Sequence, residues 1–142
     1  MDIQSVQDRI VREFEVLGDW TERYKYIIKH GAKMEPISED DRIESNLIKG
    51  CQSQVWLVAK YEDGKLSFKA DSDAAITKGL VSFVVRLYSG NTPNTILNTE
   101  PEFIGKIGMA QHLSPTRANG LASMVKQMKI YALAYKTKET SS

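Results

Sequence analysis

The sequence contains a single cysteine, Cys51, so no disulfide bond can form within the chain. One cysteine and two histidines also fail to supply the four ligands of a structural zinc site or an iron–sulfur cluster. A dithiol redox centre is excluded for the same reason. Because nothing indicates disulfide-based secretion, we expect the protein in the reducing cytoplasm, where its thiol stays available for chemistry.

An excess of charge and a long apolar run are absent as well. The 19 basic and 18 acidic side chains leave a formal net charge of +1, which gives no electrostatic reason to expect nucleic acid. No apolar run approaches the roughly 20 residues that span a bilayer. The segment MDIQSVQDRIVREF lacks the basic-then-apolar order of a signal peptide. We therefore expect neither a nucleic acid nor a membrane as partner.

The chain has enough apolar side chains for one core. Hydrophobic residues make up 42% of its 142 residues, and this length suits a single domain. We predict one domain over residues 1–142, ordered from about residue 3 to residue 136. The polar end TKETSS, residues 137–142, is expected to fray.

Helical patterns dominate both ends of the sequence. Apolar residues at three- and four-residue intervals predict a helix from Ile3 to Leu17, and Asp19 with Glu22 predicts the capped start of a second that ends at Gly31. Capping and proline signals predict the later helices: one capped by Ser72 and closed near Gly90, one opening at Thr92-Pro93, one around Phe103–Ile107, and the longest from Ser114-Pro115 to about Tyr135.

Strand patterns lie between these helical segments. Val55–Tyr61 is apolar on both alternating sets, Asp63-Gly64 is typical of a hairpin turn, and Lys65–Ala70 alternates between apolar and polar residues. Asn46–Lys49 is a further short candidate strand. The sequence therefore predicts an α+β fold, with a small antiparallel sheet and helices packed on one of its faces.

Two interpretations of Cys51 remain open. Free cysteines are commonly small, buried core residues. However, Gly50 permits unusual backbone angles, and the polar run Gln52-Ser53-Gln54 would make a poor core. The position also precedes a buried strand, which can support a projecting side chain. The second interpretation predicts a sulfur that receives a group and hands it on.

The stretch HLSPTRANGL, residues 112–121, contains the other candidates. Arg117 lies in the first turn of the longest helix, where the helix dipole disfavours a cation. It is either a solvated surface residue or a ligand for an anion, such as a thiolate or persulfide. A cysteine hydrolase would need an imidazole base. We interpret His30 as a cation that matches a helix C-terminus, which leaves His112 as the remaining candidate.

Four motifs together resemble the SufE family of sulfur-acceptor proteins. They occur in the family's order and spacing, and the resemblance extends over about residues 3–135. Ala118 departs from the pattern, where serine is more usual, and it is still a small residue. The motifs are WTERYKYIIKHGAKM at 20–34, GCQSQVWL at 50–57, ADSDAAITKGL at 70–80 and HLSPTRANGL at 112–121.

The resemblance implies a carrier and activator rather than a free-standing enzyme. Such a protein accepts sulfur from a pyridoxal-phosphate cysteine desulfurase of the SufS type, with a CsdA-type enzyme as the alternative partner. It delivers the sulfur for iron–sulfur cluster assembly on a SufBCD-type scaffold. The implied fold is IscU-like but lacks the cluster-ligating cysteines. We therefore expect no cofactor or metal in this chain, which is expected to be a monomer or a weak homodimer.

The resemblance also implies roles for individual residues. Cys51 is the sulfur acceptor, and Arg117 lies near it, with His112 as a weaker second candidate for stabilising the sulfur anion. Gly50 is expected to act as a hinge that releases a covered cysteine when the partner docks. Partner contacts are expected from Gly50, Gln52, Ser53 and Gln54, and from Asp71, Ser72 and Asp73, although these last three are equally typical of a helix start.

Two other functions remain as alternatives to the carrier. One is a cysteine-dependent enzyme, a hydrolase or thiol peroxidase, that uses His112 as its base. The other is a structural adaptor in which Cys51 is an inert core residue.

Overall fold

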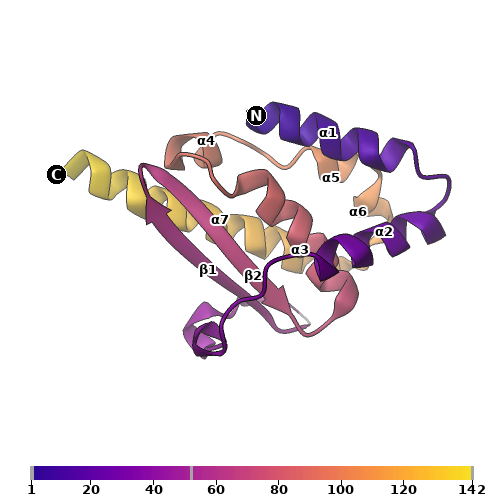
Figure 1. The fold of residues 1–142 in the computed structure, drawn as a ribbon, viewed down its shortest axis with the longest axis horizontal. Helices are drawn as coiled ribbons and strands as arrows, with labels where there is room; N and C mark the ends of the chain where they lie inside the picture. The colour runs from indigo at the N-terminus through magenta and orange to yellow at the C-terminus, as the bar shows by residue number, and fades with distance from the viewer. Residues whose placement is uncertain (1, 52, 142) are drawn as a thin grey trace.

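The computed structural model describes residues 2–51 and 53–141 and shows a two-stranded antiparallel sheet lying against a layer of helices (Figure 1). The α+β class is confirmed. In chain order the elements are α1 (Ile3–Glu15), α2 (Trp20–Ala32), the one-turn helices η1 (Glu39–Asp41) and η2 (Glu44–Asn46), β1 (Val55–Glu62), β2 (Lys65–Ser72), α3 (Ala75–Tyr88), α4 (Pro93–Leu97), α5 (Phe103–Lys106), α6 (Met109–His112) and α7 (Pro115–Ser141).

The hairpin of β1 and β2 forms as its sequence pattern predicts. Asp63 and Gly64 have φ values of 55° and 77°, the left-handed conformation that a two-residue hairpin turn requires. On β2, one alternating set of side chains is buried and the other is exposed, so one face of the sheet contacts the core and the other contacts solvent. The buried set is Leu66, Phe68 and Ala70, and the exposed set is Lys65, Ser67 and Lys69.

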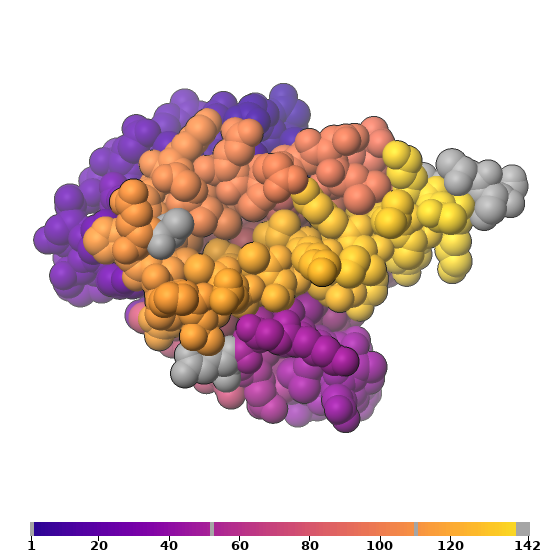
Figure 2. Space-filling view, turned by 180° about the vertical axis from the view of Figure 1, so that it is seen from behind, coloured from indigo at the N-terminus to yellow at the C-terminus, as the bar shows by residue number. Residues whose placement is uncertain are grey.

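Helices α3 and α7 cover the inner face of the sheet. Leu80, Phe83 and Leu87 of α3 and Met124 and Met128 of α7 are buried in one hydrophobic cluster with the sheet residues. Seen from behind, α7 runs across the opposite side of the molecule and reaches its right-hand end in the view (Figure 2). Although α7 is long, no helix within residues 2–51 and 53–141 is both long and apolar enough to cross a membrane.

Three predicted boundaries are wrong. Asn46–Lys49 forms no strand: Asn46 ends η2, and Leu47 makes only an isolated bridge to Trp56. Ser72 does not cap α3, because it still pairs with β1, and Ala74 takes the N-cap position. The last helix continues past Tyr135 to Ser141, since no glycine or proline follows to end it.

The interpretation of His30 as a dipole-matching cation is also wrong. Its ring stacks on Phe83 with centroids 3.8 Å apart, and its Nδ1 lies 2.7 Å from Ser82 Oγ. Burial, followed by the charge of Arg86, lowers the pKa of His30 from 6.5 to about 4. The carboxylate of Glu13 binds Arg86 through both oxygens and leaves His30 Nε2 only a long 3.4 Å contact to Arg86. His30 is therefore a neutral, packed ring at pH 7.

We expect acid to destabilise this fold through His30. The folded-state pKa lies below the unfolded value, so the contribution of the neutral ring is complete above pH 6.5 and is lost as the pH falls towards 4. Because the ring is partly exposed, we expect a loss of about 1–2 kcal/mol. Urea unfolding at pH 7 and at about pH 4.5 measures it. His30→Gln should flatten the dependence in this window; an equally steep loss in that variant would contradict the assignment.

Candidate functional site

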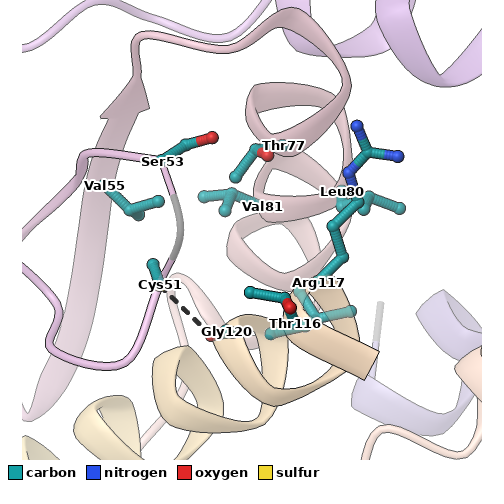
Figure 3. A pocket seen from close by; sticks show the side chains of 10 residues that line it. Cys51, Ser53, Val55, Thr77, Leu80, Val81, Thr116, Arg117 and Gly120 are labelled. Carbon is teal, nitrogen blue, oxygen red and sulfur yellow. Dashed lines mark hydrogen bonds between the residues drawn. The ribbon is translucent and has the colours of Figure 1, made fainter. Parts of the chain in front are cut away.

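Cys51 lies on an excursion of the chain whose two ends are tied together. Ile48 N donates a hydrogen bond to Val55 O at 2.8 Å, next to the isolated bridge between Leu47 and Trp56. Between these ties the chain passes over the first turns of α7 (Figure 3). We call Lys49–Cys51 together with Ser53–Gln54 the Cys51 segment. The predicted Gln52 contact falls on a residue outside those that the structure describes.

Gly50 sets the path of the Cys51 segment. Its φ is 89°, a conformation that side chains with a Cβ rarely adopt. A Cβ at this position would also lie 3.1 Å from Ser123 Oγ on α7. Two physical constraints therefore favour glycine at position 50: the backbone angle and the close approach to α7.

The thiol of Cys51 is held in a covered position. Its Sγ lies 3.6 Å from the carbonyl oxygen of Gly120 and donates a hydrogen bond to it. The residue is partly buried, and this burial raises the pKa of the thiol above its usual value. Cys51 is therefore a neutral, shielded thiol in this conformation rather than an activated thiolate.

A cavity of about 290 Å³ opens beside Cys51. The Cys51 segment, β1, α3 and α7 each contribute to its wall (Figure 3). Its side chains form an apolar floor and a polar rim, which suits the protection of a reactive sulfur from water. The floor consists of Val55, Leu80, Val81 and Leu121, and the rim consists of Ser53, Thr77, Thr116 and Arg117.

Arg117 lines the same cavity as Cys51, but its charge does not face the sulfur. The side chain is exposed, and its guanidinium points away from Cys51, alongside α3 (Figure 3). Its backbone N–H donates to Ser114 Oγ at 3.2 Å. The structure therefore brings the two residues to one cavity, while stabilisation of a sulfur anion by Arg117 stays a prediction for another conformation.

The structure does not bring His112 to the thiol. Its exposed ring stacks on Trp20 with centroids 3.9 Å apart, and its carbonyl oxygen accepts a hydrogen bond from Tyr24 at 2.9 Å. The other histidine, His30, packs on Phe83 between α2 and α3. Neither ring is among the described residues that line the cavity, so an enzyme with an imidazole base beside Cys51 has no support in this geometry.

Of the three polar residues before α3, Asp73 is exposed, whereas Asp71 and Ser72 are buried. Asp73 is exposed, and its carboxylate accepts a hydrogen bond from Gln54 N at 3.0 Å while its own N–H donates to Gln54 O at 3.3 Å. This reciprocal pair fastens the Cys51 segment to the connection between β2 and α3. Of the predicted partner-binding residues, Ser53, Gln54 and Asp73 therefore lie at or beside the cavity rim.

Asp71 and Ser72 are buried in the free chain, so neither side chain is presented for the partner contact predicted for it. Asp71 is only 4% exposed, and it accepts hydrogen bonds or ion pairs from Arg42, from Lys78 Nζ at 3.4 Å and from Ser72 N at 2.8 Å. Burial alone would raise the pKa of Asp71, but these three donors outweigh it and hold the pKa below its usual value. Asp71 therefore stabilises the fold next to the site.

Sequence reasoning missed Gly120 as a contact of the thiol. In the sequence, Gly120 stands out only as a weak helix former in an early turn of the longest helix. That misfit was the available signal, because a glycine inside a helix often marks a close approach of another chain segment. The missing information was the partner, which lies 69 residues earlier in the sequence.

Comparison with known proteins settles the family. The family described as "SufE: Fe-S metabolism associated domain" matches residues 8–132, which include the Cys51 segment and the first turns of α7. The chain belongs to the SufE family. Membership supports a role in sulfur transfer within iron–sulfur metabolism.

Individual relatives agree with this family. An uncharacterized SufE-like protein of Synechocystis sp. is 39% identical over 127 residues, covering 89% of this chain and 80% of the relative. A SufE-like protein of Rhizobium meliloti, also uncharacterized, is 40% identical over 127 residues, covering 86% and 91%. The solution structure of a hypothetical protein from Thermus thermophilus has the same fold, with a TM-score of 0.77 at 19% identity over 93% of this chain and 96% of the other.

Proposed function

We propose that this SufE protein accepts sulfur on Cys51 from a SufS-type cysteine desulfurase, stimulates that enzyme, and delivers the sulfur to a SufBCD-type scaffold. One observation carries the proposal: the single cysteine of the chain lies at a cavity, covered by α7, on a segment that bends at a glycine. An inert core cysteine would need neither the positive-φ glycine nor the polar rim. A carrier must shelter its sulfur between two partners and expose it to each.

The transfer is a thiol–disulfide exchange. The Cys51 thiolate attacks the terminal sulfur of the partner's persulfide; a new S–S bond forms on Cys51, and the bond to the partner's cysteine breaks. That cysteine leaves as a thiolate and can take the proton that Cys51 gave up, so no oxidant or reductant is consumed. Because Cys51 is neutral and bonded to Gly120 in the covered position, it has to leave that position before it reacts.

The proposal assigns no cofactor to this chain. Pyridoxal phosphate belongs to the desulfurase, which releases the sulfur from its substrate cysteine. The chain acts as a carrier and activator rather than a free-standing enzyme, as a monomer or weak homodimer in the cytoplasm, where a free thiol stays reduced. A CsdA-type desulfurase is the alternative donor.

Mass spectrometry tests the proposal directly. After incubation with a desulfurase and cysteine, Cys51 should gain one sulfur atom, about 32 Da, and a reductant should remove it. Parallel reactions with a SufS-type and a CsdA-type enzyme identify the donor. If neither active enzyme adds sulfur to Cys51, the proposed carrier function is wrong.

Arg117→Ala should affect the transfer but not the resting thiol. The guanidinium points away from the covered sulfur, so alkylation of Cys51 in the free protein should stay within about twofold of wild type. In the exposed state a charge-assisted contact to the sulfur anion is lost, and the rate of persulfide formation should fall by about tenfold. Rapid-quench mass measurement gives this rate.

Two further variants define the role of Arg117. Arg117→Lys keeps the charge without the planar fork and should fall between the alanine variant and wild type. Arg12→Ala removes an exposed arginine from α1 and serves as the matched control. Wild-type acceptance of sulfur by Arg117→Ala would remove Arg117 from the transfer step.

A further inference from the structure

We propose that Gly120 is the positioning residue that keeps Cys51 covered: its bare α-carbon leaves room for the sulfur, and its carbonyl binds the thiol. The proposal deepens the proposed function, and its consequence for sulfur transfer rests on it. Gly120 lies in the second turn of α7, facing the Cys51 segment across the edge of the cavity (Figure 3). Its effect on the reaction is exerted through Cys51.

The first argument is the space that Gly120 leaves. A Cβ built on Gly120 has Sγ, Cα and Cβ of Cys51 as its three nearest atoms, at 3.1, 3.5 and 3.6 Å. The contacts to Cα and Cβ are ordinary van der Waals distances, whereas the contact to Sγ is unusually tight, so the sulfur has to shift by a few tenths of an ångström. Any side chain at position 120 therefore competes with the sulfur itself. The nearest neighbours belong to the residue that has to move in the proposed function.

The second argument is helix propensity. Glycine inside a helix costs about 0.8–1.0 kcal/mol relative to alanine, so α7 would be more stable with alanine at position 120 if the space allowed it. Gly120 is buried at a site where that gain requires the sulfur of Cys51 to shift from its place. The helix thus keeps a weak helix former at a position that contacts the thiol.

The third argument is the charge of the sulfur. A carbonyl oxygen accepts a hydrogen bond from the neutral thiol but has nothing to offer a thiolate or persulfide anion, which donates no proton. The Gly120 contact therefore favours the protonated, unmodified form of Cys51. When Cys51 leaves the covered position, it loses this hydrogen bond, and its thiol ionises more readily. The exposed sulfur is therefore also more nucleophilic.

The decisive experiment is alkylation of the free protein by iodoacetamide as a function of pH. Gly120→Ala should displace Cys51 from the covered position and raise the alkylation rate near neutral pH on the order of tenfold. The apparent pKa from the pH profile should fall towards that of an ordinary cysteine, a change that a general loss of stability does not produce. Gly105→Ala, at an exposed helical glycine with no atom within 4 Å of the added Cβ, is the matched control and should behave as wild type.

A double-mutant cycle with Cys51→Ala provides a second test. With the sulfur removed, alanine at position 120 meets only ordinary contacts, so Gly120→Ala should destabilise the wild-type background but not the Cys51→Ala background in urea unfolding. If Gly120→Ala alone fails to fold, recovery in the double variant still supports the proposal.

An unchanged alkylation profile in folded Gly120→Ala, or equal destabilisation in both backgrounds, overturns it. Neither test uses a partner protein, so failure here leaves the sulfur-gain test of the carrier function intact, and the reverse also holds.

Discussion

Cys51→Ser is expected to abolish sulfur acceptance while the fold is retained. A serine hydroxyl is a weak nucleophile at neutral pH and forms no persulfide, and the sequence has no second cysteine to replace Cys51. We therefore expect sulfur gain to fall by at least about 100-fold, to the detection limit. The change removes little volume from a partly buried position, so the free energy of unfolding should change by less than about 1 kcal/mol.

The same variant separates the carrier from a structural adaptor. The carrier predicts that Cys51→Ser still binds the desulfurase but no longer relieves it of sulfur, so stimulation of cysteine turnover disappears. The binding constant and the turnover rate are measured side by side, and Arg12→Ala, at an exposed position of α1 away from the cavity, serves as the control. If Cys51→Ser stimulates the partner as well as wild type does, Cys51 is an inert residue and the adaptor interpretation holds.

Local patterns predicted most of the fold because local forces determine those parts. The alternation of Lys65–Ala70 reproduces the burial of β2, and the Asp63-Gly64 turn adopts the angles that its residue types favour. The Asp19–Glu22 spacing produced the expected cap, in which Asp19 accepts a hydrogen bond from Glu22 N at 2.9 Å.

Predictions failed where tertiary pairing overrides a local signal. Ser72 reads as a helix cap, but strand pairing with Val55 holds it in β2. His30 is at the end of a helix, but packing against Phe83 decides its protonation. Asp71 is predicted to lie at a docking surface, but its carboxylate is buried and bound by Arg42, which lies 29 residues earlier in the sequence. Each failure involves a contact between segments that no local pattern encodes.

The candidate site divides in the same way. Cys51 and Gly50 could be predicted, because a sole cysteine after a glycine and before a buried strand is unusual in itself. The family motif added Arg117, and the structure places it at the same cavity. The direction of its guanidinium depends on how α7 packs beside the sheet. The glycine at position 120 signals a close approach to α7, but the sequence does not show that the approaching residue is Cys51.

Among the substitutions considered, Asp71→Ala is expected to lower the free energy of unfolding the most. Asp71 is the common partner of Arg42 and Lys78, and Arg42 also lies over the ring of Trp56 at 5.2 Å. Removing one partner of a buried ionic group costs about 3–5 kcal/mol; because Arg42 and Lys78 remain 27% and 29% exposed, we expect about 2–3 kcal/mol here. Urea unfolding measures the loss, and Asp40→Ala, at an exposed position of η1, is the control.

The loss at Asp71 should also reach the thiol. Arg42 lies in the connection between α2 and the Cys51 segment. Its contact with Asp71 links this connection to the end of β2, where Asp71 pairs with Trp56. Without this tie the ends of the segment are less restrained, so alkylation of Cys51 should be faster in Asp71→Ala than in wild type. Asp71→Asn keeps an acceptor for Ser72 N and should lie between the two in both measurements. A loss of less than about 0.5 kcal/mol in Asp71→Ala would show that the ion pairs contribute nothing to stability, and would restore Asp71 as a candidate for partner binding.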